Sequence, residues 1–177
     1  MNLLEILQEK KKQILSTWID RTLDSHISSG FFKKSRDQFA NPIGANIRDG
    51  LTKIFDLLVS KAAIEEFTAP MDQVIRIRAI QDFLPSQAVA PFLELKWVIR
   101  QALTDDKKLD LEKLNLADLE YEIDKVALAA FDMYTRCREQ LYQVRIKELK
   151  SGSHILTDST CPSKMVRQDI ETLSKIH

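Results

Sequence analysis

Polar side chains that could bind a ligand or hold two helices together gather in one stretch of the sequence. Arg78 and Asp82 stand four residues apart there, which places them on one face of a helix. Asp132 and Arg136 repeat this spacing further along the chain. As exposed ion pairs, the two would contribute only about 0.3–0.5 kcal/mol each.

Asp132 supports a second interpretation, because apolar residues flank it on both sides. A carboxylate in such surroundings is expected to be partly buried and hydrogen-bonded. It would then join a network that binds two central helices to a third and suits two alternative arrangements, or that lines a pocket for a small anion or an apolar molecule. The candidate ligand or switch network comprises Arg78, Gln81, Asp82, Ser86, Gln87, Asp132 and Arg136.

No residue of this set has the neighbours that catalysis needs. Ser86 has no base beside it in the sequence, so its hydroxyl is expected to bond backbone groups in the first turn of a helix. The chain contains no GxGxxG, P-loop or GxSxG pattern. We therefore expect no catalytic residues and no enzymatic activity.

Cofactor ligands are also poorly supplied. The three histidines are His26, His154 and His177, so the interior of the chain offers no proximal histidine for a haem. Cys137 lies in a helical pattern and Cys161 in a loose tail, without the spacing of a zinc site or a redox pair. We expect two ordinary thiols, and neither a metal nor any other cofactor.

Composition restricts the class of protein further. The 26 basic and 26 acidic residues cancel, which argues against nucleic acid as a partner. Four glycines and many Leu, Ala, Glu, Lys and Ile residues favour an all-α fold. The N-terminus has no secretory signal pattern, and no apolar stretch is long enough for membrane insertion, so we expect a cytoplasmic protein.

Two helices are expected to meet where the polar residues gather. Helical spacing of apolar residues stops before Phe83 and resumes after Pro85, a residue favoured at the first position of a helix. Pro91 lies inside the second helix and has no N–H to offer the carbonyl of Gln87. We expect a bend at this point.

Local signals predict the remaining helices. Asn2 and Glu5 resemble a capping box, which starts a helix that runs to about His26. Asn41 and Pro42 begin the next helix as N-cap and first residue, and Pro70 is expected to begin a third in the same way. A final helix is expected from Leu116 to Lys150.

The final helix carries apolar residues at alternating steps of three and four, the pattern of a heptad seam. At about 1.5 Å per residue it extends roughly 50 Å, more than a compact domain of this size needs for its own core. We expect it to pair with a second copy, so that the protein is a homodimer. The candidate dimer seam comprises Leu116, Leu119, Ile123, Val126, Ala130, Met133, Cys137 and Val144.

The predicted organisation is one domain followed by an appendage. Residues 1–150 are expected to form a single helical domain, since the chain is too short for two full ones. Residues 151–177 begin with a Ser-Gly-Ser break and are expected to form a tail with one short amphipathic helix.

Two long motifs resemble a known family. RAIQDFLPSQA, from Arg78 to Ala88, is similar to the R-A-x-Q-D-F-x-P-S-Q-A signature of RsbRD-type N-terminal domains, which belong to RsbT co-antagonists. ALAAFDMYTRCREQLYQVRIKEL, residues 127–149, is similar to the closing helix of that family. The resemblance covers roughly residues 4–150. Matched signature positions are Arg78, Gln81, Asp82, Pro85, Ser86, Gln87, Asp132, Tyr134, Arg136, Cys137 and Arg138.

The resemblance implies a globin-like, all-helical sensor domain without haem, usually dimeric, of the kind found at the front of stressosome proteins and some bacterial sensor kinases. About 27 residues follow Lys150, so we expect a free-standing form without a STAS or kinase output domain. Its partner would be a separate signalling or output protein. The sequence departs from the family at Leu84, where threonine is common, and at Pro91.

Overall fold

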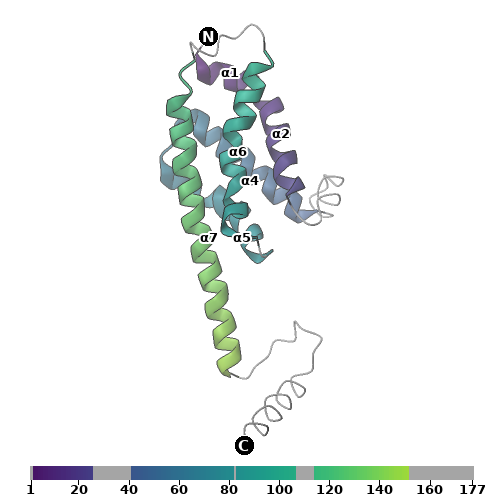
Figure 1. The fold of residues 1–177 in the computed structure, drawn as a ribbon, viewed down its shortest axis with the longest axis vertical. Coiled ribbons are helices and arrows are strands. Elements are labelled where there is room, and N and C mark those ends of the chain that lie inside the picture. Colours follow the sequence, from purple (N-terminus) through teal and green to yellow (C-terminus); the bar gives the residue numbers. More distant parts are fainter. Residues whose placement is uncertain (1, 26–40, 82, 107–113, 152–177) are drawn as a thin grey trace, which may run out of the picture. The chain divides into compact units, whose positions relative to one another are not determined.

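Every regular element is a helix in residues 2–25, 41–81, 83–106 and 114–151, which the computed structural model describes (Figure 1). The elements are α1 (Leu3–Glu9), α2 (Lys11–Asp24), α4 (Pro42–Ser60), the 3-10 helix η1 (Ile64–Phe67), α5 (Thr68–Ile80), α6 (Pro85–Thr104) and α7 (Ala117–Ser151). The all-α prediction is confirmed, whereas the globin-like arrangement stays a prediction. Within the described ranges, no helix combines the length and the apolar content needed to span a bilayer.

The chain divides into two compact units, Met1–Arg138 and Glu139–His177, and the boundary falls inside α7. The first unit holds the other helices and the beginning of α7, and the second starts with the remainder of α7. The predicted boundary between residues 1–150 and 151–177 stays a prediction. The short helix predicted in the tail falls on residues 152–177, outside the described part of the chain.

Helix starts follow the capping signals closely. The Glu5 carboxylate accepts the N–H of Asn2 at 2.9 Å, and the Asn2 side chain accepts from the first turn, as the capping box predicts. Asn41 Oδ1 accepts the N–H of Gly44 at 2.9 Å, with Pro42 as the first residue of α4. Both predicted starts are confirmed.

Two predicted boundaries were wrong. The first helix breaks at Lys10 into α1 and α2, although no turn signal marks this residue in the sequence. The third helix begins at Thr68 and not at Pro70. Pro70 is tolerated because the first four N–H groups of a helix have no intrahelical partner, so a missing donor there costs nothing.

α4 and α5 approach closely at Gly50. A Cβ atom at this position would lie 2.8 Å from Val74 Cγ2 and 2.9 Å from the carbonyl oxygen of Pro70. Glycine is therefore needed for the contact of the two backbones, which compensates for its low helix propensity.

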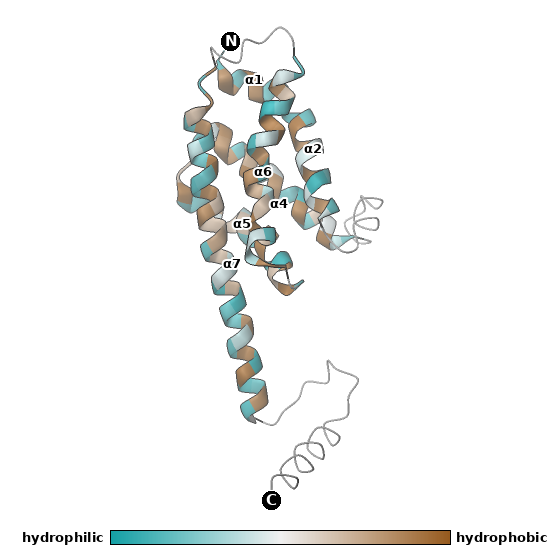
Figure 2. Cartoon of the chain, in the orientation of Figure 1, coloured by the Kyte–Doolittle hydropathy of each residue, from teal (hydrophilic) through white to brown (hydrophobic). Residues whose placement is uncertain are grey.

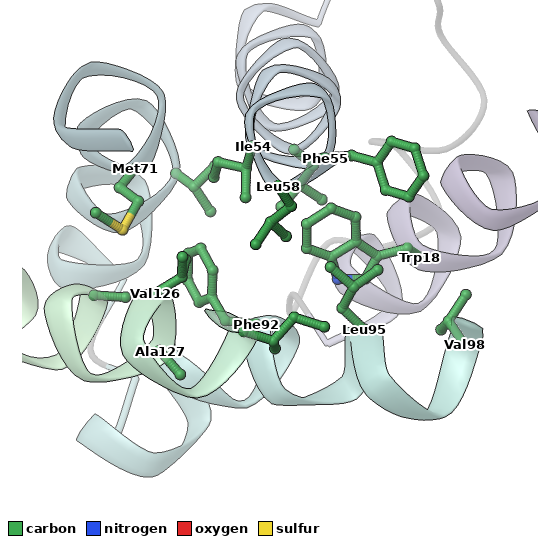
Figure 3. Packing of buried hydrophobic residues seen from close by; sticks show 14 of the residues in the cluster. Trp18, Ile54, Phe55, Leu58, Met71, Phe92, Leu95, Val98, Val126 and Ala127 are labelled. Carbon is green, nitrogen blue, oxygen red and sulfur yellow. The ribbon is translucent and has the colours of Figure 1, made fainter. Parts of the chain in front are cut away.

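The core of the first unit receives large side chains from five helices. Figure 3 shows Trp18 of α2, Phe55 of α4, Met71 of α5, Phe92 of α6 and Val126 of α7 around one apolar centre. Each is at most 2% exposed. The cluster fixes the helices whose ends form the site described below.

The predicted dimer seam occupies this same core. Its members Leu116, Leu119, Ile123, Val126, Ala130, Met133 and Cys137 are buried or half-buried against helices of the same chain, and only Val144 is exposed. This corrects the assignment of the stripe from Leu116 to Cys137, because those side chains already have partners within the subunit. Homodimerisation itself stays a prediction, and it needs another surface.

Candidate functional site

A buried arginine occupies the junction between α5 and α6. Arg78 lies in the last turn of α5 and is 0% exposed, which makes it one of the largest fully buried side chains of the described residues. Burial lowers its pKa to about 10, and the nearby Glu94 opposes this shift. The guanidinium is therefore positively charged at neutral pH, and such a buried charge requires hydrogen-bond partners.

Helix ends supply those partners. Arg78 Nη2 donates to the carbonyl oxygen of Gln87 in α6 at 2.8 Å and to Ser25 Oγ, which caps the end of α2, at 3.0 Å. The centre of the Phe83 ring, in the connection between α5 and α6, lies 4.3 Å from the guanidinium carbon. One side chain thus links the ends of three helices.

Pro91 explains why the Gln87 carbonyl accepts this bond. In an uninterrupted helix this oxygen would accept the N–H of residue 91, and proline has none. The sequence predicted that the Gln87 carbonyl lacks its usual helical donor, and Arg78 supplies a donor in its place. The carbonyl of Pro91 itself accepts Trp18 Nε1–H at 2.7 Å. The carbonyls of Gln87 and Pro91 in this turn thus each accept a hydrogen bond from a side chain of another helix.

α7 is attached to the same junction through two backbone carbonyls. The Tyr134 hydroxyl donates to the carbonyl of Phe83, and Arg138 Nη1 donates to the carbonyl of Ala79 at 2.9 Å. The Ala79 carbonyl is one of the last in α5, a group that lacks an intrahelical donor. Arg78, Phe83, Tyr134 and Arg138, with the groups they bond, are called the junction site below.

A family model described as the RsbT co-antagonist protein rsbRD N-terminal domain matches residues 12–149 of this chain. The chain belongs to this family. The family is one of regulatory sensor domains of stressosome-related signalling. An uncharacterized protein of Archaeoglobus fulgidus is 23% identical over 149 residues, which cover 82% of this chain and 89% of that protein. No solved structure matches the chain.

Two signature residues of the RsbRD N-terminal domain are not where they were expected. Asp132 and Arg136 are both exposed on α7, so the interpretation of Asp132 as a buried network member was wrong. Tyr134 and Arg138 take that place, two residues further along and about 200° round the helix. The signal was available, because Tyr134 lies four residues after Ala130 of the buried stripe.

The other signature residues divide between the junction site and the surface. Gln81 is half-buried and ends α5, and Asp82 lies outside the described residues. The side chain of Gln87 accepts the N–H of Leu84 at 3.0 Å, while its carbonyl serves Arg78. Ser86 is exposed in the first turn of α6. No signal in the sequence pointed to Ser25.

An open groove lies beside the junction, between α6 and α7. It has a volume of about 1070 Å³, and its lining is mostly apolar. A pocket was predicted between the central helices and the final helix, but of the residues predicted to form its network only Ser86 lines this groove. Lining residues are Leu84, Pro85, Ser86, Val89, Ala90, Leu93, Glu94, Asp124, Ala127, Leu128 and Phe131.

Metal or thiol chemistry gains no support from the described part of the chain. It contains no group of three His, Cys, Asp or Glu side chains placed to hold a metal ion. Burial raises the pKa of the Cys137 thiol, which lowers its reactivity. His26, His154, His177 and Cys161 lie outside the described residues.

Proposed function

We propose that this RsbRD N-terminal domain is a non-enzymatic signal-input domain that acts through dimerisation and contact with a separate signalling protein. The observation that carries the proposal is the double attachment at the junction site. Arg78 bonds the ends of α2 and α6 to α5, and Tyr134 and Arg138 bond α7 to the same place.

Such an arrangement suits the transfer of a small displacement. A displacement of the end of α5, or of the α5–α6 connection, must either carry α7 with it or break its bonds to the carbonyls of Ala79 and Phe83. A buried carbonyl left unpaired costs about 1–3 kcal/mol. Packed helices with discrete hydrogen-bond partners favour two states over a continuous range. α7 is then the element that presents the state of the domain.

The part of α7 beyond Arg138 has the composition of a contact surface. Figure 2 shows hydrophobic segments, in brown, along this part of the helix. Its exposed large apolar and aromatic side chains are Leu141, Tyr142, Val144, Ile146 and Leu149, between 40% and 57% exposed. Apolar residues gathered on one exposed helix are typical of a surface that binds another protein.

A domain exchange tests this function. Residues 1–150 would replace the N-terminal domain of an RsbT co-antagonist, and the stress-dependent output would be measured with a reporter gene. We expect a regulated output from this chimera. The double variant Tyr134→Phe with Arg138→Met should lower the ratio of induced to basal output severalfold, because it separates α7 from the junction while the apolar core remains.

Arg136→Met is the matched control, since the same residue type is removed from the exposed side of α7. It should leave the ratio unchanged. An unregulated output from a chimera that is folded by circular dichroism would contradict the proposed function, as would equal effects of Arg136→Met and of the double variant.

A second candidate function is the binding of a small apolar molecule in the groove between α6 and α7. The apolar lining and the location favour it over the binding of a small anion. Native mass spectrometry tests this candidate, because a bound molecule adds a fixed mass to the subunit.

A further inference from the structure

A pocket of about 820 Å³ lies where the beginnings of α1 and α7 meet the end of α4 and its connection to η1. All of its lining residues belong to the first unit, and it shares none of them with the groove between α6 and α7. Its volume is that of a small-molecule site. Asn2, Leu3 and Leu4 of this lining precede residue 12, where the match to the family model begins, so the pocket is built partly from a segment outside that match.

α1, which forms one wall of the pocket, is held in place by the rest of the first unit. Ile6 and Leu7 are at most 1% exposed and belong to the apolar core. At the break between α1 and α2, Lys10 Nζ lies 3.0 Å from Asp106 Oδ2. This wall of the pocket is therefore formed before any ligand binds.

The more deeply buried part of the lining consists of leucine side chains from three helices and from the segment before α7. They are Leu58 and Leu119, which are buried, and Leu3, Leu4 and Leu114, which are half-buried. An apolar group that enters the pocket would replace water next to these side chains, which favours binding.

Four charged side chains also line the pocket, and only two of them neutralise each other. Lys125 Nζ lies 2.7 Å from Glu122 Oε2. Among the residues that the structure describes, neither Lys61 nor Asp118 forms an ion pair. Asp118 Oδ2 accepts the Nδ2 amide of Asn115 at 3.2 Å, a neutral donor that does not cancel the carboxylate charge. The pocket thus presents one uncompensated positive charge and one uncompensated negative charge.

The backbone at Lys61 gives a second reason to expect a use for its side chain. Lys61 ends α4 in the left-handed conformation, at φ 55° and ψ 42°, and within the described ranges no other non-glycine residue has a positive φ. Glycine is the residue favoured at such a position, because a Cβ atom is strained there. The end of α4 would therefore be more stable without lysine, whereas a binding site that needs a cation accounts for it.

We propose that this pocket binds a small zwitterion with an apolar side chain, of the chemical class of the free apolar amino acids. The carboxylate of the ligand pairs with the Lys61 ammonium group, its ammonium group pairs with the Asp118 carboxylate, and its side chain packs on the leucines. A ligand of a single charge would be attracted by one of the two residues and repelled by the other. The inference goes beyond the proposed function and stands without it, because the pocket includes no residue of the junction site.

Isothermal titration calorimetry of the full chain with L-leucine, L-isoleucine, L-methionine and L-phenylalanine tests the inference. At least one of the four should bind in saturable fashion at or below millimolar concentration. For the amino acid that binds most tightly, two analogues separate the charges: the amide, which lacks the carboxylate, and the deaminated acid, which lacks the ammonium group. Each analogue should bind at least about 10-fold more weakly, because it loses one charge-assisted contact.

Variants of the two charged residues locate the site. Lys61→Met and Asp118→Asn should each weaken binding at least about 10-fold. Lys12→Met is the matched control, since Lys12 is exposed on α2 and does not line the pocket, and it should leave the affinity within a factor of about two. Lys61→Gly should weaken binding as much as Lys61→Met and yet raise the thermal midpoint of unfolding, because glycine relieves the left-handed backbone.

The inference is overturned if none of the four amino acids binds at millimolar concentration. It is equally overturned if either analogue binds as tightly as its parent amino acid, since the ligand would then not be recognised as a zwitterion. Equal effects of Lys61→Met and Lys12→Met would place the binding elsewhere on the molecule.

Failure of the inference and failure of the proposed function give different results. A regulated chimera together with a chain that binds none of the amino acids refutes only the ligand site. An unregulated chimera together with zwitterion binding that Lys61→Met abolishes refutes only the signalling function.

Discussion

Arg78 and Pro91 depend on each other across two helices. The proline leaves the Gln87 carbonyl without a donor, and the buried guanidinium supplies one at 2.8 Å. The charge gains a fixed acceptor in return, which offsets part of its desolvation. Two residues that each look unfavourable alone, a helix-interior proline and a buried cation, are compatible in combination.

This dependence gives a prediction for Arg78→Met. Methionine keeps much of the side-chain volume but donates no hydrogen bond, so the free energy of unfolding should fall by about 2–3 kcal/mol. In a Pro91→Ala background, the new alanine provides the N–H that the Gln87 carbonyl lacks, and the same Arg78 substitution should cost about 1 kcal/mol less. Urea unfolding of the four proteins measures the coupling.

Arg76→Met is the control on the same helix, because Arg76 is exposed and pairs with Asp72 one turn away. It should cost at most about 0.5 kcal/mol. Independent effects of the Arg78 and Pro91 substitutions would show that the carbonyl of Gln87 does not link them.

At the scale of an element, α6 has only half of a capping box. Gln87 Oε1 accepts the N–H of Leu84, but leucine at the N-cap position cannot accept from the first turn. The backbone of Leu84, at φ −64° and ψ 150°, already has the extended conformation of an N-cap residue. The missing part is a side-chain oxygen.

Leu84→Thr should therefore stabilise the protein by about 0.5–1 kcal/mol relative to Leu84→Val. Threonine and valine have nearly the same shape, so the comparison isolates the hydroxyl and removes the effect of losing an exposed leucine. Thermal or urea unfolding of both variants measures the difference. Equal stabilities would mean that the first turn of α6 gains nothing from a side-chain cap.

Helices were predictable where their signals are local. Asn2, Asn41 and Pro85 mark starts that depend only on neighbouring residues, and all three are confirmed. The heptad pattern of α7 was also correct as a helix, but it could not tell a core from a dimer seam, since both bury one stripe. The α7 donors to the junction carbonyls lie more than 50 positions from their acceptors in sequence, so local patterns could not pair them.

At the scale of the whole molecule, α7 is shared between two units. The 35-residue helix crosses from the first unit to the second between Arg138 and Glu139. Before that point its apolar stripe is buried in the core, and after it the large apolar side chains are exposed. The last side chain of the first unit, Arg138, is the one that bonds the junction at Ala79.

Native-state hydrogen exchange should therefore divide α7 at this position. Amides of residues 121–137 should exchange only when the helical bundle opens, because one face of this segment is buried in the core. Amides of residues 142–150 should exchange at least about 100-fold faster, since a short helical segment without buried side chains is marginally stable in water. Uniform protection along α7 would mean that residues 142–150 are buried in solution, and α7 would then be a core helix over its whole length.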